Sequence, residues 1–358
     1  MKRVIMLGAV ALLVYCSSGL SRAAQDAVTG DWIGRLKETP RGLVIYLSLS
    51  SNSEQGKHRF NMGFDVPAQE FKGLDPYSSS ASQVQFMLPR EAGTVVFDGI
   101  FKDGKGVGDF RFVVNGSFVS AMRGLGYDNL SVEKLFAMAV HDLNTGFINE
   151  MKSLGYSDLP IDKLIAMRIH RVDGDFIRRM QGLGYRNLAA DRLIAMRIHG
   201  VDEKFIKEVE ALGFGNLSVD KLITMRIHRI DGDFINKAKA MGFDKLSIDE
   251  LVTMSIHRVD EDFVKEMRAL GFNNLSLQQL VSLRIHRVDA KFVKEMEELG
   301  YRNLPIEKLV AMRIHRVDAK FVKEMRELGY TNLSVDELMR LRISGVDADF
   351  VKKMKGVQ

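Results

Sequence analysis

Histidine and arginine recur in register along this chain, and they are the residues whose type and spacing could do chemistry. Seven histidines stand 29 residues apart, at His141, His170, His199, His228, His257, His286 and His315. Imidazoles in register could bind a metal ion, sense pH or contact an anionic partner. A zinc site needs three or four converging ligands. Each unit offers one histidine, no cysteine and cationic neighbours, such as Arg168 and Arg171 around His170. We therefore predict no metal site.

Two interpretations of the histidines remain. Each one follows the last apolar residues of a predicted helix, where a polar or cationic side chain interacts favourably with the terminal carbonyl groups. Ser344 occupies the eighth position of the series, which fits a tolerant structural role. The alternative is contact with a partner through His170, His199, His228, His257, His286 and His315.

An arginine stands two residues before most of these histidines. The series comprises Arg168, Arg197, Arg226, Arg284, Arg313 and Arg342, and Ala139 and Ser255 interrupt it. Aligned guanidinium groups could bind an acidic peptide or a polyanion by bidentate pairing, which makes the arginines at 168, 197, 226, 284 and 313 candidate partner contacts. They could equally pair within the chain, with the Asp helix caps or with Glu295 and Glu324. We prefer pairing within the chain, and partner contact remains the alternative.

The chain contains no recognisable catalytic constellation. We find no nucleophile, base and acid arranged as a triad, no phosphate-binding loop and no paired acids. Asp173-Gly174-Asp175 is interpreted as a helix-capping segment, because a calcium loop would need a glutamate spaced beyond it. The sequence therefore predicts a protein that is not an enzyme and carries no cofactor.

The elements that position these residues form a strict 29-residue repeat. Phenylalanine recurs at 118, 147, 176, 205, 234, 263, 292, 321 and 350, without insertion or deletion. Three residues before each Phe stands a preferred helix N-cap, namely Asn115, Asn144, Asp173, Asp202, Asp231, Asp260, Asp289, Asp318 and Asp347. A glycine such as Gly184 then ends the first helix. Residues 118–358 are predicted to form an α-solenoid of eight helical hairpins with a terminal capping helix.

The second helix of each unit begins near a serine, as at Ser218, with Pro160 and Pro305 in place of serine in two units. In the unit around Ser218, we expect Val219, Leu222, Ile223, Ile227 and Ile230 to form its buried face. Each helix is too short to persist alone, so stacking must stabilise it.

Residues 24–117 have a different sequence pattern. Apolar and polar residues alternate in 31–36, 43–49, 58–66, 83–88, 94–101 and 106–114. Asp103-Gly104 predicts a tight hairpin turn between the last two segments. We predict a small antiparallel β domain, either a sandwich or an open barrel, in which Trp32 fills the core and Ser78–Ser82 form a surface loop. The fold class is therefore α+β in two parts.

The first 23 residues resemble a secretory signal peptide. Lys2 and Arg3 precede an apolar stretch from Val4 to Tyr15, and Ser21-Arg22-Ala23 provides a cleavage site. Twelve apolar residues are too few to span a bilayer, which needs about 20. A lipid anchor on Cys16, the single cysteine, is not expected because the bulky Tyr15 precedes it. The sequence predicts export to a bacterial periplasm or exterior, without disulfides.

Charge and hydropathy limit the partners. With 51 Lys and Arg against 46 Asp and Glu, the chain lacks the strongly basic domain of a nucleic-acid binder. No later segment is apolar enough to span a membrane. A protein or peptide partner is expected, and the oligomeric state is left open.

Both parts resemble exported bacterial helical-repeat proteins and the extracytoplasmic repeat tails of antirepressor-type membrane metallopeptidase sensors. The segments that carry this resemblance are 193–201 (LIAMRIHGV), 205–208 (FIKE), 90–94 (REAGT) and 97–106 (FDGIFKDGKG). The peptidase motif His-Glu-x-x-His is absent, and the resemblance implies no chemistry. We predict a non-enzymatic exported scaffold that binds a protein or peptide through its repeats. The alternative is a small-ligand carrier that uses the β domain, with the repeats as a spacer.

Overall fold

A computed structural model describes residues 28–40, 42–52, 59–77 and 82–356 of the 358. The predicted leader, with Cys16, and the Ser78–Ala81 part of the predicted loop lie outside the described residues. The chain forms two compact units. The first comprises the β domain with the following helices, up to residue 182 and again from 186 to 194. The second comprises 183–185 and the chain from 195 onward.

Six strands form one antiparallel sheet, in the order β3-β2-β1-β6-β5-β4. Their bounds are β1 Thr29–Thr39, β2 Gly42–Asn52, β3 Arg59–Pro67, β4 Ser82–Arg90, β5 Gly93–Lys102 and β6 Lys105–Val114. A short 3-10 helix, η2, spans Ala68–Glu70. The six predicted strands are thus confirmed; five are slightly longer than the alternation alone indicated, and β3 is shifted by one residue.

The sheet is curled, and aromatic rings fill its inner face. Phe60 of β3 and Phe110 of β6 are three strand spacings apart along the sheet, about 14 Å if it were flat, yet their ring centroids are 6.3 Å apart. The arrangement is therefore the open barrel and not the sandwich. Trp32 lies edge-on to Phe86 and Phe97, with centroids at 5.1 and 5.9 Å. Its indole N–H donates to the Asp98 carbonyl at 3.1 Å, so Trp32 fills the core as predicted.

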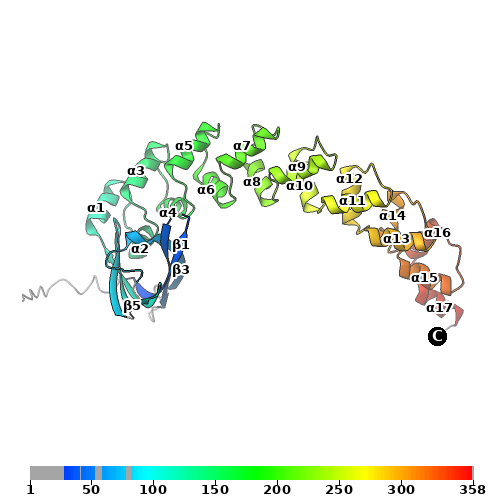
Figure 1. The fold of residues 1–358 in the computed structure, drawn as a ribbon, viewed down its shortest axis with the longest axis horizontal. Helices are drawn as coiled ribbons and strands as arrows, with labels where there is room; N and C mark the ends of the chain where they lie inside the picture. The colour runs from blue at the N-terminus through cyan, green and yellow to red at the C-terminus, as the bar shows by residue number, and fades with distance from the viewer. Residues whose placement is uncertain (1–27, 41, 53–58, 78–81, 357–358) are drawn as a thin grey trace, which may run out of the picture. The chain divides into compact units, whose positions relative to one another are not determined.

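Seventeen helices follow the sheet (Figure 1). They are α1 Gly116–Gly124, α2 Val132–Val140, α3 Thr145–Ser153, α4 Ile161–Ile169, α5 Gly174–Gly182, α6 Ala190–Ile198, α7 Glu203–Ala211, α8 Val219–Ile227, α9 Gly232–Ala240, α10 Ile248–Ile256, α11 Glu261–Ala269, α12 Leu277–Ile285, α13 Ala290–Glu298, α14 Ile306–Ile314, α15 Ala319–Glu327, α16 Val335–Ile343 and α17 Ala348–Lys355. The regular array of short helices confirms the predicted helical solenoid.

The first hairpin is packed onto the sheet. Phe136 of α2 lies over the inner face, with ring centroids 5.4 Å from Phe60, 5.6 Å from Phe110 and 5.5 Å from Phe112. The Glu91 carboxylate, in the β4–β5 turn, accepts hydrogen bonds of 2.9 Å from the backbone and hydroxyl of Thr145 at the start of α3. The β domain therefore shares its core with the beginning of the array.

Helix ends follow the sequence signals closely. The Asp260 carboxylate accepts a bond of 2.9 Å from the Phe263 N–H, and the same bond recurs at the other Asp caps. First helices end at a glycine with positive φ, such as Gly271 at 91°. Pro160 and Pro305 are the N-cap residues of α4 and α14, the position that serine occupies in other repeats, and they provide no side-chain cap bond.

Candidate functional site

The arginines at the ends of the second helices contact the preceding repeat. Arg226 of α8 donates from Nε to the Gly200 carbonyl at 2.9 Å, and its guanidinium lies 4.6 Å from the centroid of Phe205. Arg313 of α14 likewise lies over Phe292, at 4.7 Å. It donates to the Arg287 carbonyl from Nε at 2.8 Å and from a terminal nitrogen at 2.6 Å. Each of these side chains therefore joins two successive repeats.

Three more members of the series adopt related geometries. Arg342 donates to the Arg316 carbonyl at 3.0 Å and covers Phe321 at 4.6 Å. Arg284 covers Phe263 at 3.9 Å and pairs with the Asp260 carboxylate at 3.2 Å. In the first unit, Arg168 donates to the His141 carbonyl at 3.1 Å and lies 5.3 Å from the Phe147 ring. We call Arg168, Arg226, Arg284, Arg313 and Arg342 the inter-repeat arginines. Arg197 holds the same place at the end of α6 and is half-buried.

The acceptors of these arginines differ from those expected. They are mostly backbone carbonyls of the preceding repeat, whereas Arg284 pairs with the Asp260 helix cap. Glu295 and Glu324 instead lie 3.9 and 3.6 Å from Lys291 and Lys320, one turn earlier on their own helices. A backbone carbonyl at the helix end of the preceding repeat lies within hydrogen-bond distance of Arg168, Arg226, Arg313 and Arg342.

Ser255 shows what happens where the arginine is missing. Its hydroxyl donates to the His228 carbonyl at 2.7 Å, so the backbone acceptor is still satisfied. The hydroxyl is too short to cover the ring of Phe234, which is half-buried, whereas Phe263 is 2% exposed. The ring of Phe234 is therefore less well buried in the core than the ring of Phe263.

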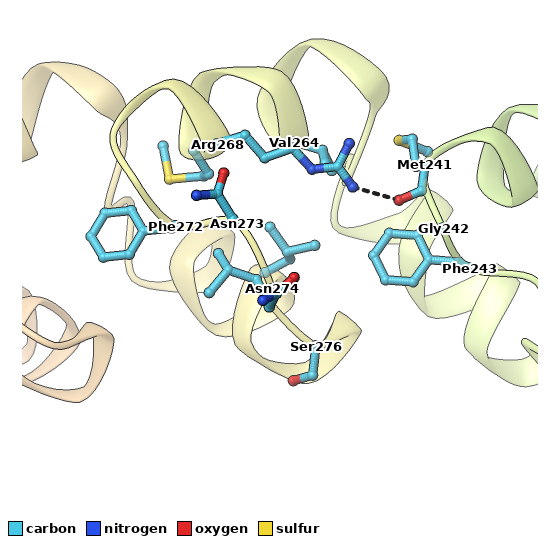
Figure 2. Close-up of a pocket in the computed structure, with 12 residues that line it drawn as sticks. Met241, Gly242, Phe243, Val264, Arg268, Phe272, Asn273, Asn274 and Ser276 are labelled. Atoms are coloured by element: carbon cyan, nitrogen blue, oxygen red, sulfur yellow. Dashed lines mark hydrogen bonds between the residues drawn. The ribbon is translucent and has the colours of Figure 1, made fainter.

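A second series of cations, at the ends of the first helices, was missed by the sequence reasoning. Arg268 of α11 donates to the Met241 carbonyl at 2.7 Å, beside a hollow of about 360 Å³ lined by Phe243, Phe272 and Asn274 (Figure 2). Lys355 makes the equivalent bond to Leu328 at 2.6 Å. Lys239, Arg268, Arg326 and Lys355 share the 29-residue spacing, which was the available signal. The spacing is harder to see in the sequence because the equivalent positions of other repeats hold glutamine or glutamate.

The histidines are half-buried C-cap residues of the second helices. Within the described residues, their imidazoles make no hydrogen bond to the helix-end carbonyls. Those carbonyls are taken by arginine or serine from the next repeat. No group of three or more His, Cys, Asp or Glu side chains in the described part of the chain could hold a metal ion.

His141, the first of the series, differs from the others because it lies against the β domain. Its ring centroid is 6.3 Å from that of Phe64. Burial lowers its pKa below the ordinary 6.5, and the charge of Arg168 lowers it further.

We expect the first unit to lose stability as the pH falls through about 6.5, because the unfolded chain then binds a proton that the folded unit disfavours. Above that pH the contribution of His141 is fully present. Thermal unfolding of the wild type and of His141→Gln between about pH 7.5 and pH 5 checks this, and the variant should show the shallower pH dependence. Equal slopes would contradict it.

Exposed isoleucines form a row at the ends of the second helices. In the second unit they are Ile198, Ile227, Ile256, Ile285, Ile314 and Ile343, each between 52% and 64% exposed. We call these six the isoleucine row, and Ile169 of α4 occupies the same position in the first unit. The prediction that Ile227 is buried was wrong. At 100° per residue it lies almost opposite the Leu222–Met225 stripe, which faces the core.

An exposed arginine follows two residues after most of these isoleucines. Arg229, Arg258, Arg287 and Arg316 adopt left-handed backbone conformations, with φ between 52° and 56°. Glycine serves the same position at Gly200 and Gly345, with φ of 68° and 71°. A non-glycine residue in this region costs roughly 1 kcal/mol. Four repeats of the second unit thus carry a charged side chain where glycine would relieve backbone strain.

No protein-family model matches this sequence, and comparison with curated proteins finds no match. The fold defines the protein as a curled antiparallel β domain followed by a helical solenoid. None of the helices in the described ranges is both long enough and apolar enough to cross a membrane.

Proposed function

We propose that this protein is a non-enzymatic exported scaffold that binds a protein or peptide through the second-helix ends of its repeats. The observation that carries the proposal is the isoleucine row. Each of the central repeats buries at least seven apolar side chains in the core, yet the isoleucine at this position is identical in six successive repeats and remains more than half exposed. Exposed apolar patches of this continuity are typical of interaction surfaces. Export rests on the leader predicted for residues 1–23.

The spacing of the row favours an extended partner. Helices α8, α10, α12, α14 and α16 pack against one another in succession, at a usual interaxial distance of about 8–10 Å. A polyproline II segment has three residues per turn and rises about 3.1 Å per residue, so every third side chain lies on one face about 9.3 Å from the last. One apolar side chain per turn of such a segment would match one isoleucine per repeat.

The charges beside the row favour an acidic partner. Arg229, Arg258, Arg287 and Arg316 are exposed and make no side-chain hydrogen bond or ion pair within the described residues. The inter-repeat arginines and the histidines lie at the same helix ends, but the arginines are engaged with the preceding repeat. We therefore propose that the inter-repeat arginines support the surface and do not supply its main contacts.

The inner face of the β domain bears on the alternative of a small-ligand carrier. Phe86 and Phe97 stack there at 4.7 Å, and Trp32, Phe71 and Phe110 pack around them. Aromatic side chains occupy the space in which a barrel would hold a ligand, which favours the scaffold. Mass spectrometry of small molecules that co-purify with the chain tests the alternative directly.

The proposed surface predicts which peptides the array selects. A phage-displayed library of random peptides, panned on the full chain, should yield segments with an apolar residue at every third position and acidic residues between them. The triple variant Ile227→Ser, Ile256→Ser, Ile285→Ser should bind the selected peptides at least tenfold more weakly, because it removes roughly 1.5–3 kcal/mol of apolar burial per side chain.

The matched control is Lys265→Ser, Lys294→Ser, Lys323→Ser, which changes exposed first-helix residues at the same spacing. It should leave peptide binding within twofold of the wild type. Fluorescence polarisation measures both variants, and circular dichroism checks that each remains folded. Selected peptides that bind the isoleucine variant as well as the wild type, or a library that yields no binder, would refute the proposed surface.

A further inference from the structure

The outer face of the β domain carries three rows of like side chains, which the strand register places directly across from one another. Asp31, Asp109 and Asp98 form an acidic row across β1, β6 and β5. Two residues further along the strands, Ile33, Val107 and Ile100 form an aliphatic row. Two residues beyond that, Arg35, Lys105 and Lys102 form a basic row.

Each row is unfavourable in an isolated domain. Like charges directly opposite each other on neighbouring strands destabilise a sheet. Asp98 is compensated by Arg111 at 3.1 Å and by Gln85 at 2.6 Å. In the part of the chain that the structure describes, Asp31, Asp109, Arg35 and Lys105 have no ion pair. The three aliphatic side chains are 58%, 54% and 52% exposed, at the floor of a hollow of about 660 Å³.

The order of the rows makes this face complementary to itself. When two copies meet face to face about a two-fold axis along the aliphatic row, the acidic row of each lies against the basic row of the other. Asp109 then faces Lys105 of the second copy, Asp31 faces Arg35 and Asp98 faces Lys102. Val107, Ile33 and Ile100 each face their own counterpart. A two-fold interface requires self-complementarity of this kind.

We propose that the occupant of this face is a second copy of the chain, so that the protein forms a homodimer through β1, β6 and β5. A second copy offsets the repulsion in both charged rows and covers the aliphatic row. An anionic lipid surface or an acidic peptide would satisfy the basic row only, and it would face the repulsion of the acidic row. This inference is independent of the function proposed for the repeats.

The dimer is weak. Three strands by five residues cover roughly 14 by 17 Å, about 250 Å² per copy. Stable interfaces bury about 800 Å² per partner. Association is therefore expected to be weak and to increase with protein concentration. A dimer presents two arrays at once, which increases the avidity for a partner that carries repeated binding segments.

Sedimentation velocity of the full chain between about 5 and 500 µM tests the proposal. Asp109→Lys and Lys105→Asp should each weaken self-association at least tenfold, because each sets like charges against each other across the two-fold axis. An equimolar mixture of the two single variants should associate like the wild type, since both pairs then have opposite charges. The double variant D109K/K105D should recover for the same reason.

Glu38→Lys and Lys72→Asp make matched charge changes elsewhere on the β domain and should leave association unchanged. Thermal melts separate misfolding from loss of the interface. At low concentration Asp109→Lys should melt no lower than the wild type, because it relieves repulsion within the acidic row. A wild type that stays monomeric throughout, single variants that still associate, or a mixture and double variant that both fail to recover would overturn the proposal.

Discussion

Replacing Phe263 by alanine is expected to destabilise the second unit by about 3–5 kcal/mol, the usual cost of deleting a fully buried phenylalanine. The ring is 2% exposed, and the Arg284 guanidinium lies 3.9 Å from its centroid. The substitution therefore leaves a cavity and also removes the surface on which the arginine rests. Urea denaturation followed by circular dichroism measures the change in the free energy of unfolding.

Phe234→Ala is the matched comparison within the same array. Phe234 occupies the equivalent position one repeat earlier, but it is half-buried because Ser255 stands where other repeats place an arginine. We expect its loss to cost less than half as much. Units of a solenoid interact mainly with their neighbours, so hydrogen exchange in Phe263→Ala should rise most in α9 to α14. Equal costs for the two substitutions, or uniform exchange throughout the chain, would show that the inter-repeat arginine does not determine burial of the ring.

The repeat could be predicted almost completely from the sequence because its signals are local. An Asp cap, the Phe three residues later and a glycine at the helix end all act within one helix. The structure gives the same bond from the Phe263 N–H to Asp260 that the spacing implies. The six strands were equally predictable from the sequence, since alternation of apolar and polar residues is a property of each segment alone.

Contacts between repeats were harder to predict from the sequence. Arg226 reaches the carbonyl of Gly200, and Arg268 that of Met241, across 26 and 27 residues. The acceptor of such a side chain depends on how one hairpin stacks on the next. From the sequence alone, nearby glutamates were as plausible as acceptors as the backbone carbonyls of the preceding repeat. The exposure of Ile227 was missed for a simpler reason. Its apolar character was counted without its angular position on the helix.

The three rows on the β domain could not be predicted from the sequence at all. Asp31 and Asp109 are 78 residues apart and become neighbours only because β1 pairs with β6. Alternation shows that both point to the same kind of face, but the register between distant strands depends on closure of the whole sheet. A single residue of slip would move every side chain of a strand to the other face.

The final prediction concerns the inter-repeat arginines, which contact the preceding repeat and also lie beside the proposed binding surface. Arg226→Ala combined with Arg284→Ala is expected to lower the free energy of unfolding of the second unit by roughly 4–7 kcal/mol. Each substitution removes a cation–π contact, worth about 0.5–2 kcal/mol, and a charge-assisted hydrogen bond of about 1.5 kcal/mol. The two sites are two repeats apart, so their effects should nearly add.

Two further variants show whether the ring contact is the cause. Arg→Lys at both positions keeps the charge but loses the planar group that lies on Phe205 and Phe263, so it should recover only part of the stability. Ser255→Arg should raise stability by about 1 kcal/mol, because it supplies the missing guanidinium over Phe234. Peptides selected on the wild type should still bind the alanine variant under conditions where it is folded. If the alanine variant melts like the wild type but loses peptide binding, the arginines are partner contacts and the assignment made here is wrong.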